Sequence, residues 1–172
     1  MKTIEIRRHS IRSYSGQNLS QAGVQLARQL GKDMTGFERV VTSPLPRAIQ
    51  TAVAMGFAVN ETADLLARFE QGLAIDGSAG GGFQDYSYAV RNNPATAQFA
   101  QELADFYQKL AQDLPEDGSA LVINHSGIVE LSAVACLPNE NLDHLGGSIH
   151  YCEGVRLKWN NGAFTSAEIL RV

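Results

Sequence analysis

Histidine and arginine side chains gather at three places along this chain. In the segment RRHSIR, Arg8 precedes His9, and Arg12 follows it by three residues. The segment SPLPR ends at Arg47, and the segment NHSG contains His125. Each segment follows a run of residues with the pattern of a β-strand. Ligands of α/β sheets bind at the carboxyl ends of strands, so we expect these side chains to meet at one site.

These residue types favour the binding of a phosphate ester. A guanidinium group is a planar fork of donors that matches the oxygens of a phosphate. A nucleotide-binding loop of the form GxxxxGK[ST] is not found, and the stretch GSAGGG at 77–82 lacks the lysine. We expect no metal site, because arginines near His9 and His125 would repel a cation. The other two histidines, His144 and His150, have no partner at metal-binding spacing.

The composition is that of a soluble globular protein. Of the 172 residues, 44% are hydrophobic and 19% charged, and the net charge is -4. We expect one domain over 1–172 and no binding to nucleic acid or to a membrane. Cys136 and Cys152 lack the spacing of a metal site or a disulfide scaffold, which predicts reduced thiols. The chain shows neither a signal-peptide pattern nor an apolar run of membrane-spanning length, so we expect a cytoplasmic protein.

Strands and helices alternate in the predicted order of elements, which indicates an α/β fold. It is expected to be a three-layer sandwich with a mostly parallel central sheet flanked by helices. Strands are predicted at 2–7, 37–43 and 119–124, helices at 19–30, 46–55, 94–114 and 126–137, and a closing hairpin at 149–159 and 163–172. The glycine-rich residues 71–93 are predicted to be irregular, either as a surface lid or cap or as a mobile loop.

The three motifs, in this order, resemble the histidine phosphatase superfamily, which has a phosphoglycerate mutase-like fold. The family opens with a strand, Arg-His-Gly and then Leu-Thr-x-x-Gly; the corresponding segments here are IEIRRHS and NLSQAG. Its Ser-Pro-x-x-Arg-Ala-x-x-Thr-Ala motif corresponds to SPLPRAIQTA. Its closing apolar strand with His-Gly-Gly corresponds to LVINHSG. The resemblance therefore extends from residue 4 to about residue 131.

The resemblance implies a role for each motif residue. His9 would be the nucleophile and become transiently phosphorylated, while Arg8, Arg47 and His125 would bind the phosphoryl oxygens. Arg12 resembles a further phosphate-binding arginine in the acid-phosphatase and phytase branch of the family. We interpret Arg7 as a solvated or ion-paired neighbour.

Two residues depart from the family pattern. Ser10 replaces the usual glycine after the first histidine. Ser126 stands where the acid-phosphatase branch has its proton-donating aspartate, so the acid is expected at the place that the mutase-like branch uses. The separation of Glu70 from Arg47 along the sequence resembles that of the acid in the mutase-like branch. The rivals for this role are Glu61 and Asp64.

The resulting hypothesis is a cofactor-independent phosphatase that hydrolyses a phosphomonoester through a phosphohistidine. Its substrate would be a small phosphorylated metabolite or a phosphoprotein. Mutases of the family have longer chains with extra segments around the substrate, so the short chain favours hydrolysis. A phosphoglycerate mutase-type phosphotransferase and a non-catalytic phospho-ligand binding module remain the alternatives.

Overall fold

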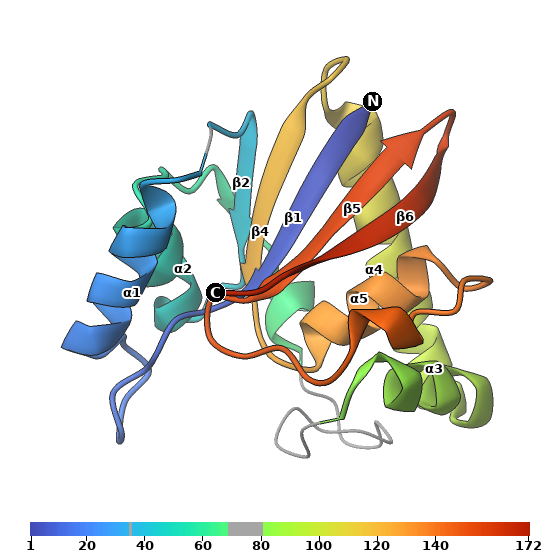
Figure 1. Ribbon diagram of the computed structural model, residues 1–172, viewed down its shortest axis with the longest axis horizontal. Helices are drawn as coiled ribbons and strands as arrows, with labels where there is room; N and C mark the ends of the chain where they lie inside the picture. The colour runs from blue at the N-terminus through green and yellow to red at the C-terminus, as the bar shows by residue number, and fades with distance from the viewer. Residues whose placement is uncertain (35, 69–80) are drawn as a thin grey trace.

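The computed structural model describes residues 1–34, 36–68 and 81–172, and six strands within these ranges form one sheet (Figure 1). Their order is β3–β2–β4–β1–β5–β6. They span β1 (Lys2–Arg8), β2 (Arg39–Thr42), β3 (Glu61–Thr62), β4 (Ser119–Asn124), β5 (Gly154–Asn160) and β6 (Ala163–Leu170). Strands β1 to β4 pair in parallel, whereas β5 is antiparallel to β1 and β6 is antiparallel to β5. The predicted mostly parallel sheet is confirmed.

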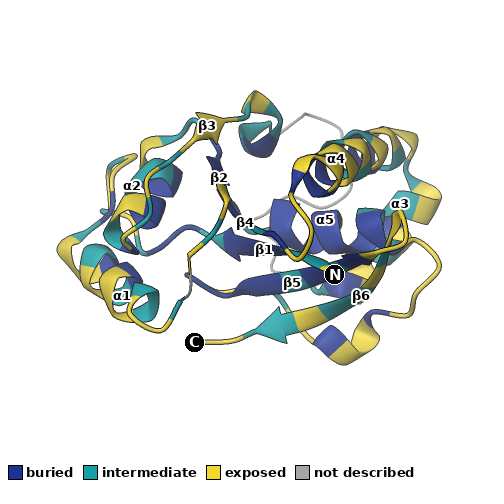
Figure 2. Cartoon of the chain, turned by 90° about the horizontal axis from the view of Figure 1, so that it is seen from above, coloured by how far each residue is buried: buried dark blue, intermediate teal, exposed yellow. Residues whose placement is uncertain are grey.

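Helices cover both faces of this sheet (Figures 1 and 2). Helices α1 (Gln21–Gly31) and α2 (Pro46–Ala54) lie on one face, and α3 (Phe83–Asn92), α4 (Pro94–Asp113) and α5 (Ile128–Cys136) lie on the other. Two short 3-10 helices, η1 (Asp64–Ala67) and η2 (Asp143–Leu145), follow β3 and α5. The three-layer arrangement agrees with the sequence prediction.

Strand β4 is buried on both faces, as its uninterrupted apolar sequence predicts. Its side chains alternate between two hydrophobic clusters: Ala120 and Val122 pack beneath α4 and α5, whereas Leu121 and Ile123 pack beneath α2. Its neighbours β1 and β2 run in the same direction. All three strands therefore end at the same edge of the sheet.

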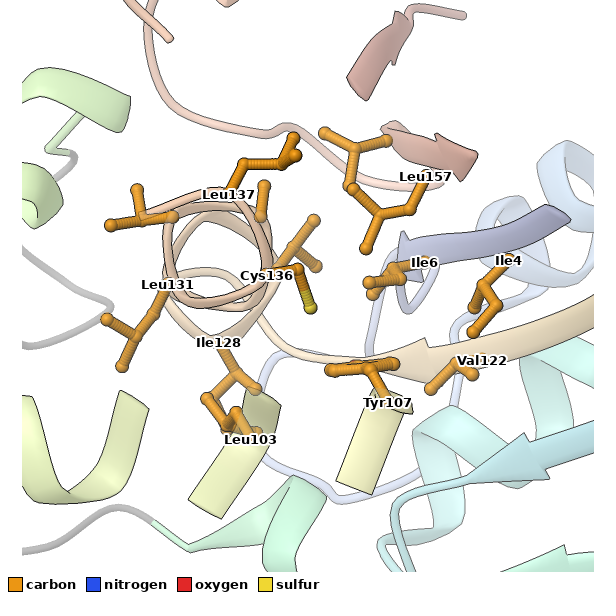
Figure 3. Packing of buried hydrophobic residues seen from close by; sticks show 14 of the residues in the cluster. Ile4, Ile6, Leu103, Tyr107, Val122, Ile128, Leu131, Cys136, Leu137 and Leu157 are labelled. Atoms are coloured by element: carbon orange, nitrogen blue, oxygen red, sulfur yellow. The ribbon is translucent and has the colours of Figure 1, made fainter. Parts of the chain in front are cut away.

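Helix α5 lies in the centre of the larger cluster (Figure 3). Its apolar residues contact both α4 and the sheet: Ile128 and Leu131 lie near Leu103 of α4, and Cys136 lies near Ile6 of β1. A helix that is apolar on nearly all sides is buried on nearly all sides. Its two polar residues within this setting, Glu130 and Ser132, are fully buried.

Two predictions about local structure are wrong. Residues 83–92 form α3 instead of an irregular segment, because Phe83, Tyr86 and Ala89 recur at helical spacing and are buried on one side of the helix. The carboxylate of Asp85 caps this helix by accepting from the amide of Gly82 at 2.9 Å. Residues 149–153 form a loop before β5, with Cys152 at a φ of 63°. Residues 71–80 of the predicted lid lie outside the described residues.

Candidate active site

The three motifs follow neighbouring strands at one edge of the sheet. His9 follows β1, Ser43 follows β2 and His125 follows β4. The amide of His9 donates to the carbonyl of Asn124 at 2.9 Å, and the amide of Ser43 donates to the carbonyl of Ile123 at 2.9 Å. Parallel pairing thus places the two histidines side by side, with ring centroids 5.2 Å apart.

The imidazole of His9 is buried and held in one orientation. Its Nδ1 lies 2.7 Å from the carbonyl oxygen of Ser10, and its Nε2 lies 3.1 Å from Nε of Arg47. A guanidinium group only donates, so Nε2 is the acceptor and Nδ1 carries the proton. Burial, together with the charges of Arg47 and Arg8, lowers the pKa of His9 to about 4. The ring is therefore neutral at pH 7, with a lone pair on Nε2.

Arg47 reaches this ring from the first turn of α2. Pro46 at the start of the helix suits a position whose N–H has no partner within the helix. The guanidinium also donates to Oε1 of Gln17 in the loop after β1. Burial, followed by the charge of Arg12, lowers the pKa of Arg47. A bound anion would relieve this repulsion between cations.

Arg8 is held by the loop that precedes β5. Its Nη1 donates to the carbonyl of Ile149 at 2.9 Å, and its guanidinium carbon lies 4.2 Å from the centre of the Tyr151 ring. Its Nε is buried and has no hydrogen-bond partner among residues 1–34, 36–68 and 81–172. An unsatisfied buried donor of a cation is costly, so this position favours an anionic ligand.

His125 is the second neutral imidazole of the site. Its Nε2 lies 2.8 Å from the hydroxyl of Ser43. Burial, together with the charges of His9 and Arg47, lowers the pKa of His125 to about 2. Two residues later, Gly127 adopts a φ of 86° and ends the strand-to-helix turn. That conformation strongly favours glycine, which explains the residue at this position of the NHSG motif.

The other two arginines of the first motif differ in environment. Arg7 is buried and paired with Glu5 at 3.1 Å, which agrees with its interpretation as an ion-paired neighbour. Arg12 is exposed, and it contributes less than Arg47 and Arg8 to the lowered pKa of His9. Arg12 therefore lies at the rim of the cluster formed by His9, Arg8, Arg47 and His125.

The expected proton donor, Glu70, lies outside the described residues. Of its rivals, Glu61 is exposed and paired with Arg39 at 2.8 Å, near the amino end of β2. This pairing holds its carboxylate away from the carboxyl ends of the strands. Asp64 is exposed in the first turn of η1.

Sequence reasoning missed Tyr151 and Gln17 as neighbours of the site. Tyr151 lies in a stretch with strand-like alternation, and its ring lies 5.8 Å from that of His9. Gln17 lies in a loop with no informative spacing. Only the long-range contacts reveal either residue.

Metal-binding clusters and membrane-spanning helices are both absent from residues 1–34, 36–68 and 81–172. Within the described ranges, no group of three or more His, Cys, Asp or Glu side chains gathers in a way that could hold a metal ion. No helix in this part of the chain is both long and apolar enough to cross a membrane. Cys136 and Cys152 are both buried free thiols.

Solved structures share this fold over nearly the whole chain. Phosphoserine phosphatase from Entamoeba histolytica, in complex with 3-phosphoglyceric acid, matches with a TM-score of 0.73 at 15% identity, covering 100% of this chain and 98% of that one. Mycobacterial glucosyl-3-phosphoglycerate phosphatase matches with a TM-score of 0.69 at 19% identity, covering 99% and 98%. Phosphoglycerate mutase from Bacillus anthracis matches with a TM-score of 0.65 at 15% identity, covering 98% and 92%. The fold is therefore phosphoglycerate mutase-like.

The family comparison agrees with the motifs. The model of the histidine phosphatase superfamily (branch 1) matches residues 5–71, which contain His9 and Arg47. The comparison with curated proteins gives no match. Over residues 5–71 the resemblance to the histidine phosphatase superfamily is thus confirmed, and the structural neighbours of the whole chain include phosphatases and a mutase.

Proposed function

We propose that this protein is a metal-independent phosphatase that hydrolyses a phosphomonoester through a phosphohistidine at His9. The observation that carries this proposal is the orientation of the His9 ring. Its Nδ1–H is tied to the Ser10 carbonyl, and its Nε2 lone pair points into the group of arginines. A neutral imidazole presented among phosphate-binding cations is suited to attack phosphorus.

In the first step, Nε2 of His9 attacks the phosphorus atom. An N–P bond forms while the ester P–O bond breaks, and the leaving oxygen takes up a proton. The Arg8 and Arg47 guanidinium groups stabilise the negative charge on the non-bridging oxygens and align the phosphoryl group with the ring. A bound dianion also raises the pKa of His125, which favours its donation of a hydrogen bond to the same oxygens.

In the second step, water attacks the phosphohistidine, the N–P bond breaks and inorganic phosphate leaves. Glu70 is our proposed proton donor to the leaving oxygen in the first step, and its carboxylate would then accept a proton from the attacking water. The exposed Arg12 is proposed as a further phosphate contact at the rim. The substrate is proposed to be a small phosphorylated metabolite or a phosphoprotein.

The test is hydrolysis of p-nitrophenyl phosphate, with and without EDTA. Rapid quenching during turnover then detects a phosphoryl label bound to the enzyme. We expect turnover that EDTA leaves unchanged, and a phosphoryl label that is stable to base and labile to acid. His9→Ala should abolish both turnover and label.

Three outcomes would contradict the proposal. A phosphoryl label on Ser10 or Ser126 would show that this serine, and not His9, is the nucleophile. Vanadate binding without turnover would favour a binding module. Transfer of the phosphoryl group to a second substrate molecule, in preference to water, would favour a mutase.

A further inference from the structure

A carboxylate lies in the hydrophobic core directly behind the candidate site. Glu130, in the first turn of α5, has no exposed surface. Its Oε2 accepts from the amide of Gly127 at 2.7 Å, and its Oε1 accepts from the amide of Ile149 at 2.8 Å. Both carboxylate oxygens are therefore used, one by the start of α5 and one by the loop before β5.

The bond to Ile149 leads directly to a proposed phosphate ligand. Ile149 donates its N–H to Glu130 and accepts the Nη1–H of Arg8 on its carbonyl oxygen. Two residues later, the ring of Tyr151 covers the Arg8 guanidinium. A movement of this loop would thus change the position of Arg8.

The bond to Gly127 leads to the second histidine. Gly127 forms the turn with positive φ between His125 and α5, and the amide of Val129 donates to the carbonyl of His125 at 3.1 Å. By accepting from Gly127, Glu130 stabilises this turn. The same carboxylate therefore supports His125 on one side and Arg8 on the other.

A helix cap alone does not require a carboxylate at this depth. Every neighbouring position of α5 is buried, and most are apolar. Transfer of a charge into such surroundings is unfavourable, and burial raises the pKa of Glu130. Its two hydrogen bonds and the nearby charge of Arg8 offset this cost.

We infer that Glu130 is a positioning residue, which holds Arg8 and His125 in the relative geometry that binds the phosphoryl group. This inference rests on the proposed function for the identity of the reaction. The effect of Glu130 on oxyanion binding can be measured without turnover, as the affinity of the protein for vanadate.

The test replaces Glu130 by Gln, which keeps the shape but turns one acceptor into an NH₂ donor. That group would face a backbone N–H, so one of the two hydrogen bonds is lost. We expect vanadate to bind roughly 10-fold more weakly. This is the lower end of the loss seen in metal sites when a residue that orients a metal ligand by a hydrogen bond is removed. Glu130→Asp, which keeps the charge, should restore part of this affinity.

The matched control is Ser132→Ala on the same helix. Ser132 is equally buried, and its hydroxyl donates to the carbonyl of Ile128 at 2.5 Å and lies 3.3 Å from the hydroxyl of Tyr107. Among the described residues it forms no hydrogen bond with Ile149 or Arg8. It should lower stability while leaving vanadate affinity unchanged. A double-mutant cycle with Arg8→Ala then asks whether Glu130 acts through Arg8: the losses for Glu130→Gln and Arg8→Ala should be strongly non-additive.

The outcomes separate this inference from the proposed function. Equal vanadate affinity in Glu130→Gln and Ser132→Ala would overturn the positioning role. Additive losses in the cycle with Arg8→Ala would overturn the part of that role that acts through Arg8. If Glu130→Gln does not fold, the same cycle with Glu130→Asp decides between the two results. A wild-type protein that binds vanadate but lacks phosphatase activity would contradict the proposed function and leave the cycle interpretable.

Discussion

At the scale of single residues, burial and charge act in the same direction on His9. His9 is 6% exposed, and desolvation and the neighbouring arginines both disfavour the protonated form of its ring. A histidine in this setting stays neutral where an exposed one would begin to titrate. In the proposed chemistry the arginines would therefore have two roles: they would bind the phosphoryl oxygens, and they would keep His9 unprotonated.

This shift predicts a pH-dependent stability. The pKa of His9 is about 4 in the folded chain and near 6.5 when unfolded. Its contribution to the free energy of unfolding is therefore full above pH 6.5 and is lost as the pH falls towards 4. Between pH 7.5 and pH 5 the loss from His9 should be about 2 kcal/mol. Urea unfolding of the wild type and of His9→Asn at both pH values measures it. The variant should lose correspondingly less stability, and an equal loss in both proteins would contradict the prediction.

At the scale of elements, α3 turns part of a predicted irregular segment into core structure. Phe83 and Tyr86 join the cluster around α5, which also carries Glu130 and follows His125. The helix therefore supports the layer behind the site.

Substitutions on the two faces of α3 test this packing. Phe83→Ala removes a fully buried ring and should cost about 3–5 kcal/mol of unfolding free energy. Tyr88→Ala, on the exposed face with 64% of the residue accessible, should change it by less than about 0.5 kcal/mol. Both are measured by urea unfolding, and similar effects of the two substitutions would show that α3 is not packed as described.

At the scale of the whole molecule, the two hydrophobic clusters share β4, whose alternating side chains belong to both. Because both clusters pack against β4, removal of this strand from one cluster would also expose apolar side chains of the other. The expectation of one domain over 1–172 therefore becomes a prediction about cooperativity.

We predict that the chain unfolds in one transition. Trp159, the only tryptophan, belongs to the cluster beneath α4 and α5, whereas far-ultraviolet circular dichroism reports on all helices. Urea transitions followed by the two signals should coincide, and vanadate should shift both to the same extent. Two separate midpoints would indicate that the faces of the sheet unfold independently.

Local sequence patterns predicted most of the elements and the main members of the candidate site. Strand burial and turn geometry depend mainly on neighbouring residues, so short sequence patterns can predict them. Examples are the apolar run SALVIN, the proline before Arg47 and the glycine of NHSG. Parallel strands end at one edge, so convergence of His9, Arg47 and His125 followed from the order of elements.

The way in which these side chains are held depends on contacts between distant parts of the chain. The orientation of the His9 ring depends on Arg47, which lies 38 positions away, and the anchoring of Arg8 depends on Ile149, which lies 141 positions away. The loop at 149–153 has the alternation of a strand, yet its contacts with Arg8 and Glu130 hold it as a loop. Such contacts arise only when distant segments pack together, and no local pattern records which buried donor will meet which acceptor.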